Sequence, residues 1–144
     1  KDIKMLASAD ALGIRESRRV VGNYILTVDD LSNSTDFEDK VVACANSIDV
    51  HCKDRVDYQT RKSEKNYYIP LSSLIVKGFS NLLVAGRCVS ADHDAQASLR
   101  IMPTCATLGE AAGIAASLAL NGNVKSVDIC MLRGILKEKG AKVD

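Results

Sequence analysis

The stretch 81–121 reads NLLVAGRCVSADHDAQASLRIMPTCATLGEAAGIAASLALN, and the fold predicted for the chain is organised around it. It opens with the apolar run 82–85, which predicts a short strand ending at Gly86-Arg87. A polar loop is expected next, and from Pro103 onward small and apolar residues predict one long helix. A strand, a polar loop and a helix start, in this order, are how an α/β protein presents backbone amides and charged side chains to a ligand.

Length and composition indicate one globular domain with a balanced charge. The chain has 144 residues, is 47% hydrophobic, and sets 19 Lys and Arg against 18 Asp and Glu, a net charge of +1. That length and hydrophobic fraction allow a buried core and argue against disorder. The balanced charge gives no reason to expect nucleic acid as a partner. The longest apolar run, from Ala111 to Leu120, is only about ten residues and too short to span a bilayer, so we expect no membrane partner.

The five cysteines form an odd set without a CxxC pair, which favours reduced thiols over a disulfide framework. A zinc site could be imagined from Cys44, His51 and Cys52 together with Cys88 or His93. These spacings match no structural zinc pattern, and we therefore predict no metal site.

Outside the central stretch, the sequence predicts a mixture of strands and short helices, and so a mixed α+β fold. A weak helix is expected over 2–12 with Gly13 as its end, and a capped turn or short helix over 27–31. A last helix begins after Ser126 or Asp128 and buries one apolar face. Strands are expected within 13–27, 41–45, 48–51 and 67–70, and a solvated loop over 53–65.

Arginines are concentrated in the predicted strand that follows Gly13. Alternation along a strand places Arg15 and Ser17 on one face and Glu16 and Arg18 on the other. A guanidinium on a rigid strand can form a bidentate pair of hydrogen bonds with a carboxylate or phosphate, which makes Arg15 a candidate substrate-binding residue. The alternative is that these arginines decorate a solvated strand face.

The long helix has two features of interest. Pro103 suits its first turn, and the amides of residues 104–106 would then face outward with the positive end of the helix dipole behind them.

One stripe of the long helix has almost no side chains and consists of Gly109, Ala112, Gly113 and Ala116. Its main expected role is close packing against a sheet or another helix.

Three blocks of the sequence resemble the C-terminal part of bacterial FAD-dependent oxidoreductases, a family distantly related to the flavoproteins of fumarate reductase and succinate dehydrogenase. The blocks are GIRESRR at 13–19, NLLVAGRCVSADH at 81–93 and SLRIMPTCATLGEAAG at 98–113. The resemblance is close over 13–30 and 81–119 and loose between 36 and 66.

The resemblance implies a set of site residues. Arg100 resembles the arginine that holds or protonates substrate, and His93 would bind substrate or shuttle protons, although a structural role stays open for it. The residues implied to bind FAD are Ala85, Gly86 and Arg87 beside the pyrophosphate and ribityl chain, and Met102, Pro103, Thr104 and Cys105 at the pyrimidine edge of the isoalloxazine.

One departure from the family is informative, because the sequence contains no GxGxxG fingerprint for a dinucleotide. We therefore expect a C-terminal fragment: 1–80 as a β-rich substrate-side region, and 81–144 as the closing strand and long helix of the FAD-binding domain, together in one unit. The parent would transfer a hydride between a small-molecule substrate and FAD. The missing N-terminal FAD-binding half is then its main partner, and the fragment alone should be inactive and lack FAD.

Two other functions stay open. One is a cofactor-free structural or interaction domain that retains the flavoprotein fold. The other is a thiol enzyme that uses Cys88 or Cys105 with His93, the helix start lowering the pKa of Cys105. The substrate and the compartment, cytoplasm or periplasm, are not decided by the sequence.

Overall fold

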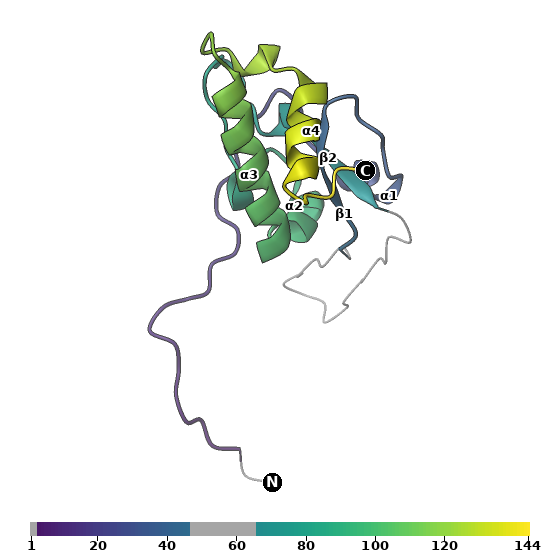
Figure 1. Ribbon diagram of the computed structural model, residues 1–144. Helices are drawn as coiled ribbons and strands as arrows, with labels where there is room; N and C mark the ends of the chain where they lie inside the picture. Colours follow the sequence, from purple (N-terminus) through teal and green to yellow (C-terminus); the bar gives the residue numbers. More distant parts are fainter. Residues whose placement is uncertain (1–2, 47–65) are drawn as a thin grey trace.

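A two-stranded sheet flanked by helices forms the centre of the protein in a computed structural model, which describes residues 3–46 and 66–144 (Figure 1). The mixed α+β class predicted from the sequence is confirmed. The elements in chain order are α1 (Val28–Ser32), β1 (Lys40–Cys44), β2 (Tyr67–Pro70), the 3-10 turns η1 (Leu71–Ser73) and η2 (Gly86–Cys88), α2 (His93–Leu99), α3 (Met102–Leu118), the 3-10 turn η3 (Val124–Ser126) and α4 (Ile129–Glu138).

The sheet is antiparallel and almost entirely buried. β1 pairs with β2 in a register that sets Val42 opposite Ile69 and Cys44 opposite Tyr67. Both strands were predicted from short apolar runs, and α3 and α4 pack against β1. The chain end also reaches this sheet, because the amide of Ala43 donates to the carbonyl of Lys142. The sheet is therefore the core on which the helices rest.

Two other predicted strands do not form. The segment 13–27 contains only single bridges, Gly22 to Val76 and Leu26 to Ala91, and 82–86 contains only the bridge between Leu83 and Ile75. A strand needs a continuous ladder of hydrogen bonds to a neighbour, and each of these segments meets its neighbour at isolated residue pairs. Both run extended beside the core without joining the sheet.

The predicted helix at 2–12 is wrong for its described residues. From Ile3 to Leu12 the chain has no helical turn, and it runs away from the body of the protein (Figure 1). Helices this short are marginal in water unless they pack on something, and Ile3 is 98% exposed. Gly13 consequently caps no helix. The strand predicted at 48–51 and the loop at 53–65 lie outside the described residues.

The polar loop predicted before the long helix is also wrong, because it contains α2. Asp92 caps this helix by accepting a hydrogen bond from the amide of Ala95 at 2.7 Å. Its second carboxylate oxygen accepts from the amide of Val28 at 2.9 Å. One carboxylate thereby joins the starts of α1 and α2. The capped turn predicted at 27–31 is confirmed as α1, with Thr27 and Asp30 forming a capping box.

This double contact predicts that Asp92→Ala destabilises the protein more than loss of an ordinary cap. Asp128 is the matched control, because it caps α4 through one bond to the amide of Met131 at 3.0 Å. A single cap contributes about 1 kcal/mol, so we expect Asp128→Ala to cost that much and Asp92→Ala roughly 1–2 kcal/mol more. Urea unfolding midpoints measure both, and equal losses would contradict the double role.

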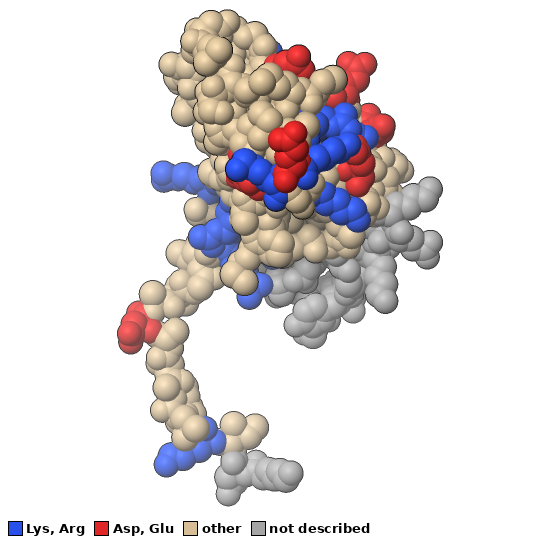
Figure 2. All heavy atoms as spheres, viewed as in Figure 1, with Lys and Arg blue, Asp and Glu red and all other residues tan. Residues whose placement is uncertain are grey.

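The long helix α3 is mostly apolar but buried on only one side. Its inner face carries Leu108, Ala111 and Ala115, and its only charged residue is Glu110. In Figure 2 charged side chains gather over α4 and the chain end, whereas the upper left of the same face is largely free of them. The exposed side of α3 also carries Glu110 and Ser117. Its apolar part, which we call the α3 outer stripe, consists of Met102, Ala106, Gly109, Gly113 and Ala116.

The α3 outer stripe has no close neighbour in the described part of the chain. A Cβ built on Gly109 or Gly113 would meet nothing within 4 Å, and Met102 is 86% exposed. Helices that are apolar on all sides are normally buried on all sides. Of the four residues predicted to pack closely, Ala112 packs against the core, whereas Gly109, Gly113 and Ala116 are exposed.

Candidate functional site

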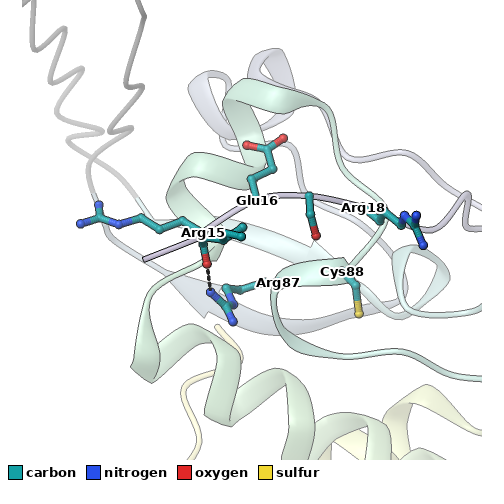
Figure 3. A pocket seen from close by; sticks show the side chains of 7 residues that line it. Arg15, Glu16, Arg18, Arg87 and Cys88 are labelled. Carbon is teal, nitrogen blue, oxygen red and sulfur yellow. Dashed lines mark hydrogen bonds between the residues drawn. The ribbon is translucent and has the colours of Figure 1, made fainter. Parts of the chain in front are cut away.

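A pocket of about 420 Å³ lies between the extended segment 14–18 and η2 (Figure 3). Two stretches of chain about seventy positions apart in sequence thus form its two walls. Its lining is strongly basic and consists of Ile14, Arg15, Glu16, Ser17, Arg18, Arg87 and Cys88.

Backbone and side-chain hydrogen bonds hold the two walls together. The amide of Val20 donates to the carbonyl of Cys88 at 3.0 Å, and Arg87 Nη1 donates to the carbonyl of Ile14 at 2.8 Å. Behind the pocket, the buried Gln96 of α2 donates from Nε2 to the carbonyl of Arg87 at 3.1 Å. The turn η2 itself begins at Gly86, whose φ of 80° is a conformation that L side chains rarely adopt. These bonds fix the basic segment 14–18 over the turn.

The charged side chains of the pocket differ in direction. In Figure 3 Arg15 and Arg18 extend to opposite sides, Arg87 lies below the segment, and Glu16 points away from Arg87. Glu16 Oε1 forms an ion pair with Arg19 and lies 3.0 Å from Nδ1 of His93. The carboxylate thus links the wall of the pocket to the first residue of α2.

The start of α3 differs in detail from the prediction. The amide of Cys105 donates to the carbonyl of Ile101 at 2.9 Å and so faces into the helix. This leaves the amides of Met102 and Thr104 without an acceptor inside the helix, since Pro103 has no N–H. Of these two residues, Met102 is exposed and Thr104 is buried. The Thr104 hydroxyl points inward, 3.4 Å from Cys44 Sγ and 3.2 Å from Asn46 Nδ2. Met102 and Pro103 are exposed at the tip.

The expected activation of Cys105 is wrong. Burial raises the pKa of its thiol above the ordinary value; the nearby Arg87 acts in the opposite direction, and Cys88 raises it further. A protonated thiol is a weak nucleophile, which argues against the thiol-enzyme hypothesis. The helix α3 packs against η2.

The structure brings several of the residues predicted from the sequence to this one region. Arg15 and Arg87 line the pocket, His93 adjoins it through Glu16, and Ala85 and Gly86 lead into η2. Arg100 lies at the C-terminal end of α2, where its amide donates to Gln96. Sequence reasoning assigned no role to Glu16 or Arg18. The sequence feature that could have identified them is their position in the block 13–19, among other basic residues.

The described ranges contain no cluster of metal-binding side chains and no single helix that could span a membrane. In 3–46 and 66–144, no three His, Cys, Asp or Glu side chains gather as they would around a metal ion. No single helix in these ranges is long and apolar enough to cross a membrane. α2 and α3 pass that test of length and composition only when they are counted together across their 92° bend.

Comparison with known proteins identifies one family. The family model described as FAD dependent oxidoreductase matches residues 1–136, which includes every residue of the pocket and of the α3 tip. No curated protein and no solved structure is similar enough to this chain to count as a match.

Proposed function

The chain belongs to the FAD-dependent oxidoreductase family, and from this we propose that it forms the C-terminal part of an enzyme that transfers a hydride between an organic substrate and FAD. FAD is the cofactor of the family. The observation that carries the proposal is the contact between Glu16 and His93 at the edge of an arginine-lined pocket. It joins a proton-carrying group to charged side chains that can hold a substrate.

Two features of the backbone, one at η2 and one at the α3 tip, fit the binding of FAD. A Cβ built on Gly86 would meet nothing within 4 Å, so the backbone there is open to a close ligand. The amide of the exposed Met102 suits an electron-rich ring edge. These residues fit the flavin end of the cofactor, and we propose 85–87 and 102–105 as its binding segments. The chemistry that FAD supplies when bound is two-electron transfer.

His93 is the residue we propose for proton transfer. Its Nδ1 lies 3.0 Å from the Glu16 carboxylate, so the second ring nitrogen, Nε2, is left to exchange a proton with substrate. The side chain is 58% exposed, and we propose that it reaches a ligand bound at the pocket. Glu16 acts as a positioning residue, because it holds the imidazole and is in turn held by Arg19.

Arg100 and Arg15 are proposed to orient the substrate. Arg100 lies at the bend between α2 and α3, immediately before the tip proposed to meet the flavin. Arg15 lines the pocket on the opposite wall from η2. Guanidinium groups at two points can fix a small molecule through its anionic or carbonyl oxygens. This orientation would bring the reacting carbon to the flavin.

We propose that a second polypeptide segment holds the adenosine end of FAD. The sequence contains no GxGxxG, and the described part of the chain contains one two-stranded antiparallel sheet, not the parallel sheet of a dinucleotide-binding domain. We propose that the missing half docks on the α3 outer stripe, which is apolar, exposed and small enough for close backbone approach. The division of this chain at residue 80 stays a prediction.

The function is tested on the full reading frame that contains this chain. We expect the purified protein to be yellow and its flavin to be reduced by an organic substrate. Arg100→Ala should slow reduction roughly ten- to a hundredfold, the effect of losing charged hydrogen bonds, without loss of flavin. Lys125→Ala, an exposed charge in η3, is the control. Stopped-flow absorbance measures the rates, and unchanged kinetics would remove Arg100 from the mechanism.

The same experiment distinguishes the proposed enzyme from a cofactor-free domain. A colourless full-length protein that takes up no added FAD would contradict the proposed function. It would favour a structural or interaction domain that keeps the family's fold.

A further inference from the structure

Basic side chains outnumber acidic ones in the lining of the pocket. Three guanidinium groups, those of Arg15, Arg18 and Arg87, line it together with the single carboxylate of Glu16. That carboxylate already pairs with Arg19 and contacts His93 outside the lining. The net charge of the chain is only +1, so this excess is a property of the site.

Hydrogen-bond donors remain available on two of these arginines. In the described ranges Arg18 is exposed and takes part in no hydrogen bond or ion pair with another described residue. Arg87 uses one N–H on the carbonyl of Ile14, and a guanidinium carries five. The donors come from both walls of the pocket. A ligand with two or more acceptor oxygens can therefore bridge segment 14–18 and η2.

Size and lining indicate a small molecule with an apolar part. A volume of about 420 Å³ falls within the range of small-molecule sites. Ile14 and Cys88 add apolar surface beside the charges. A long polyanion would instead need a basic stripe across the surface, whereas the face drawn in Figure 2 mixes both signs of charge.

We propose that this pocket binds the oxyanion group of a small organic molecule, a carboxylate or a phosphate, through Arg18 and Arg87. Calling this molecule the substrate rests on the proposed function, whereas the binding of the anion does not. Arg18 and Arg87 then determine specificity, because an uncharged analogue leaves their charges unpaired. Binding also ties segment 14–18 more firmly to η2.

Calorimetric titration of this chain, without flavin, tests the proposal. The probes are malonate, its uncharged analogue malonamide, and inorganic phosphate. We expect saturable binding of one anion per chain and no detectable binding of malonamide. The preferred anion separates the two sources: tighter malonate binding indicates a carboxylate ligand, and tighter phosphate binding a phosphate ester.

The matched variants are Arg18→Gln and Lys125→Gln, both at exposed positions. Loss of the charged contacts of Arg18 should weaken anion binding roughly tenfold or more, and Lys125→Gln should leave it unchanged. Equal affinities in the two variants, or equal binding of malonate and malonamide, would overturn the proposal. Flavin retention in the full-length protein is measured separately, so failure here would leave the proposed function standing.

Discussion

Changing His93 to Gln is expected to slow substrate-dependent flavin reduction in the full-length protein by roughly 10²- to 10⁴-fold, the usual contribution of a general acid or base. Gln keeps a polar side chain of similar length but cannot accept and release a proton at neutral pH. Flavin content should not change, because His93 is exposed and contacts Glu16, outside the segments proposed to bind FAD. Rapid-mixing absorbance under anaerobic conditions gives the rate.

Two further variants separate proton transfer from structural support. Glu16→Gln removes the charge that holds the imidazole, so we expect a smaller loss of rate, roughly tenfold, by analogy with other orienting groups. Asp94→Asn changes a charge in the same helical turn and should have little effect. A His93→Gln protein with the wild-type rate at every pH would exclude His93 from the chemistry.

Introducing a long side chain on the α3 outer stripe is expected to weaken flavin retention by the full-length protein by roughly a hundredfold. Gly113→Gln projects into the face that we propose packs against the dinucleotide-binding half, and overpacked interfaces commonly lose up to about 3 kcal/mol. In the chain alone nothing lies within 4 Å of a Cβ at Gly113, so the variant should fold normally. Gel filtration with absorbance at the flavin band measures retention.

The control is Gly134→Gln in α4, which is also an exposed helical glycine with nothing within 4 Å of an added Cβ. Both variants should stabilise the isolated chain slightly, since glycine costs about 1 kcal/mol in a helix. Only Gly113→Gln should release flavin. If both proteins keep their flavin equally, the α3 outer stripe is not the docking surface, although the enzyme activity proposed here could still be correct.

Much of the secondary structure was predictable because its causes are local. β1 and β2 follow from short apolar runs, α3 from a long run of small residues after Pro103, and α4 from an apolar face after Asp128. The helix cap at Thr27 was likewise predictable from the neighbouring residues. Each of these elements depends on residues within a few positions of one another.

Two of the errors depend on partners distant in the sequence, and a third is local. Segment 82–86 has the composition of a strand, but a strand also requires a neighbour along its whole length, and it meets Ile75 at a single bridge. Residues 3–12 have a helical pattern but nothing to pack on. The helix α2 was missed because its cap, Asp92, was interpreted as a loop residue among other polar side chains.

The sequence by itself determined the family, the order of the main elements and the residue types available for chemistry, because these follow from local pattern and from three matching blocks. Only the tertiary structure decided which side chains meet. Glu16 and His93 are 77 positions apart, and Arg87 contacts Ile14 across 73. Such pairs depend on how the extended segment 14–18 lies over η2, and no local sequence pattern encodes this arrangement of residues distant in the sequence. The same holds for the outer face of α3, whose exposure became visible only once the packed face was known.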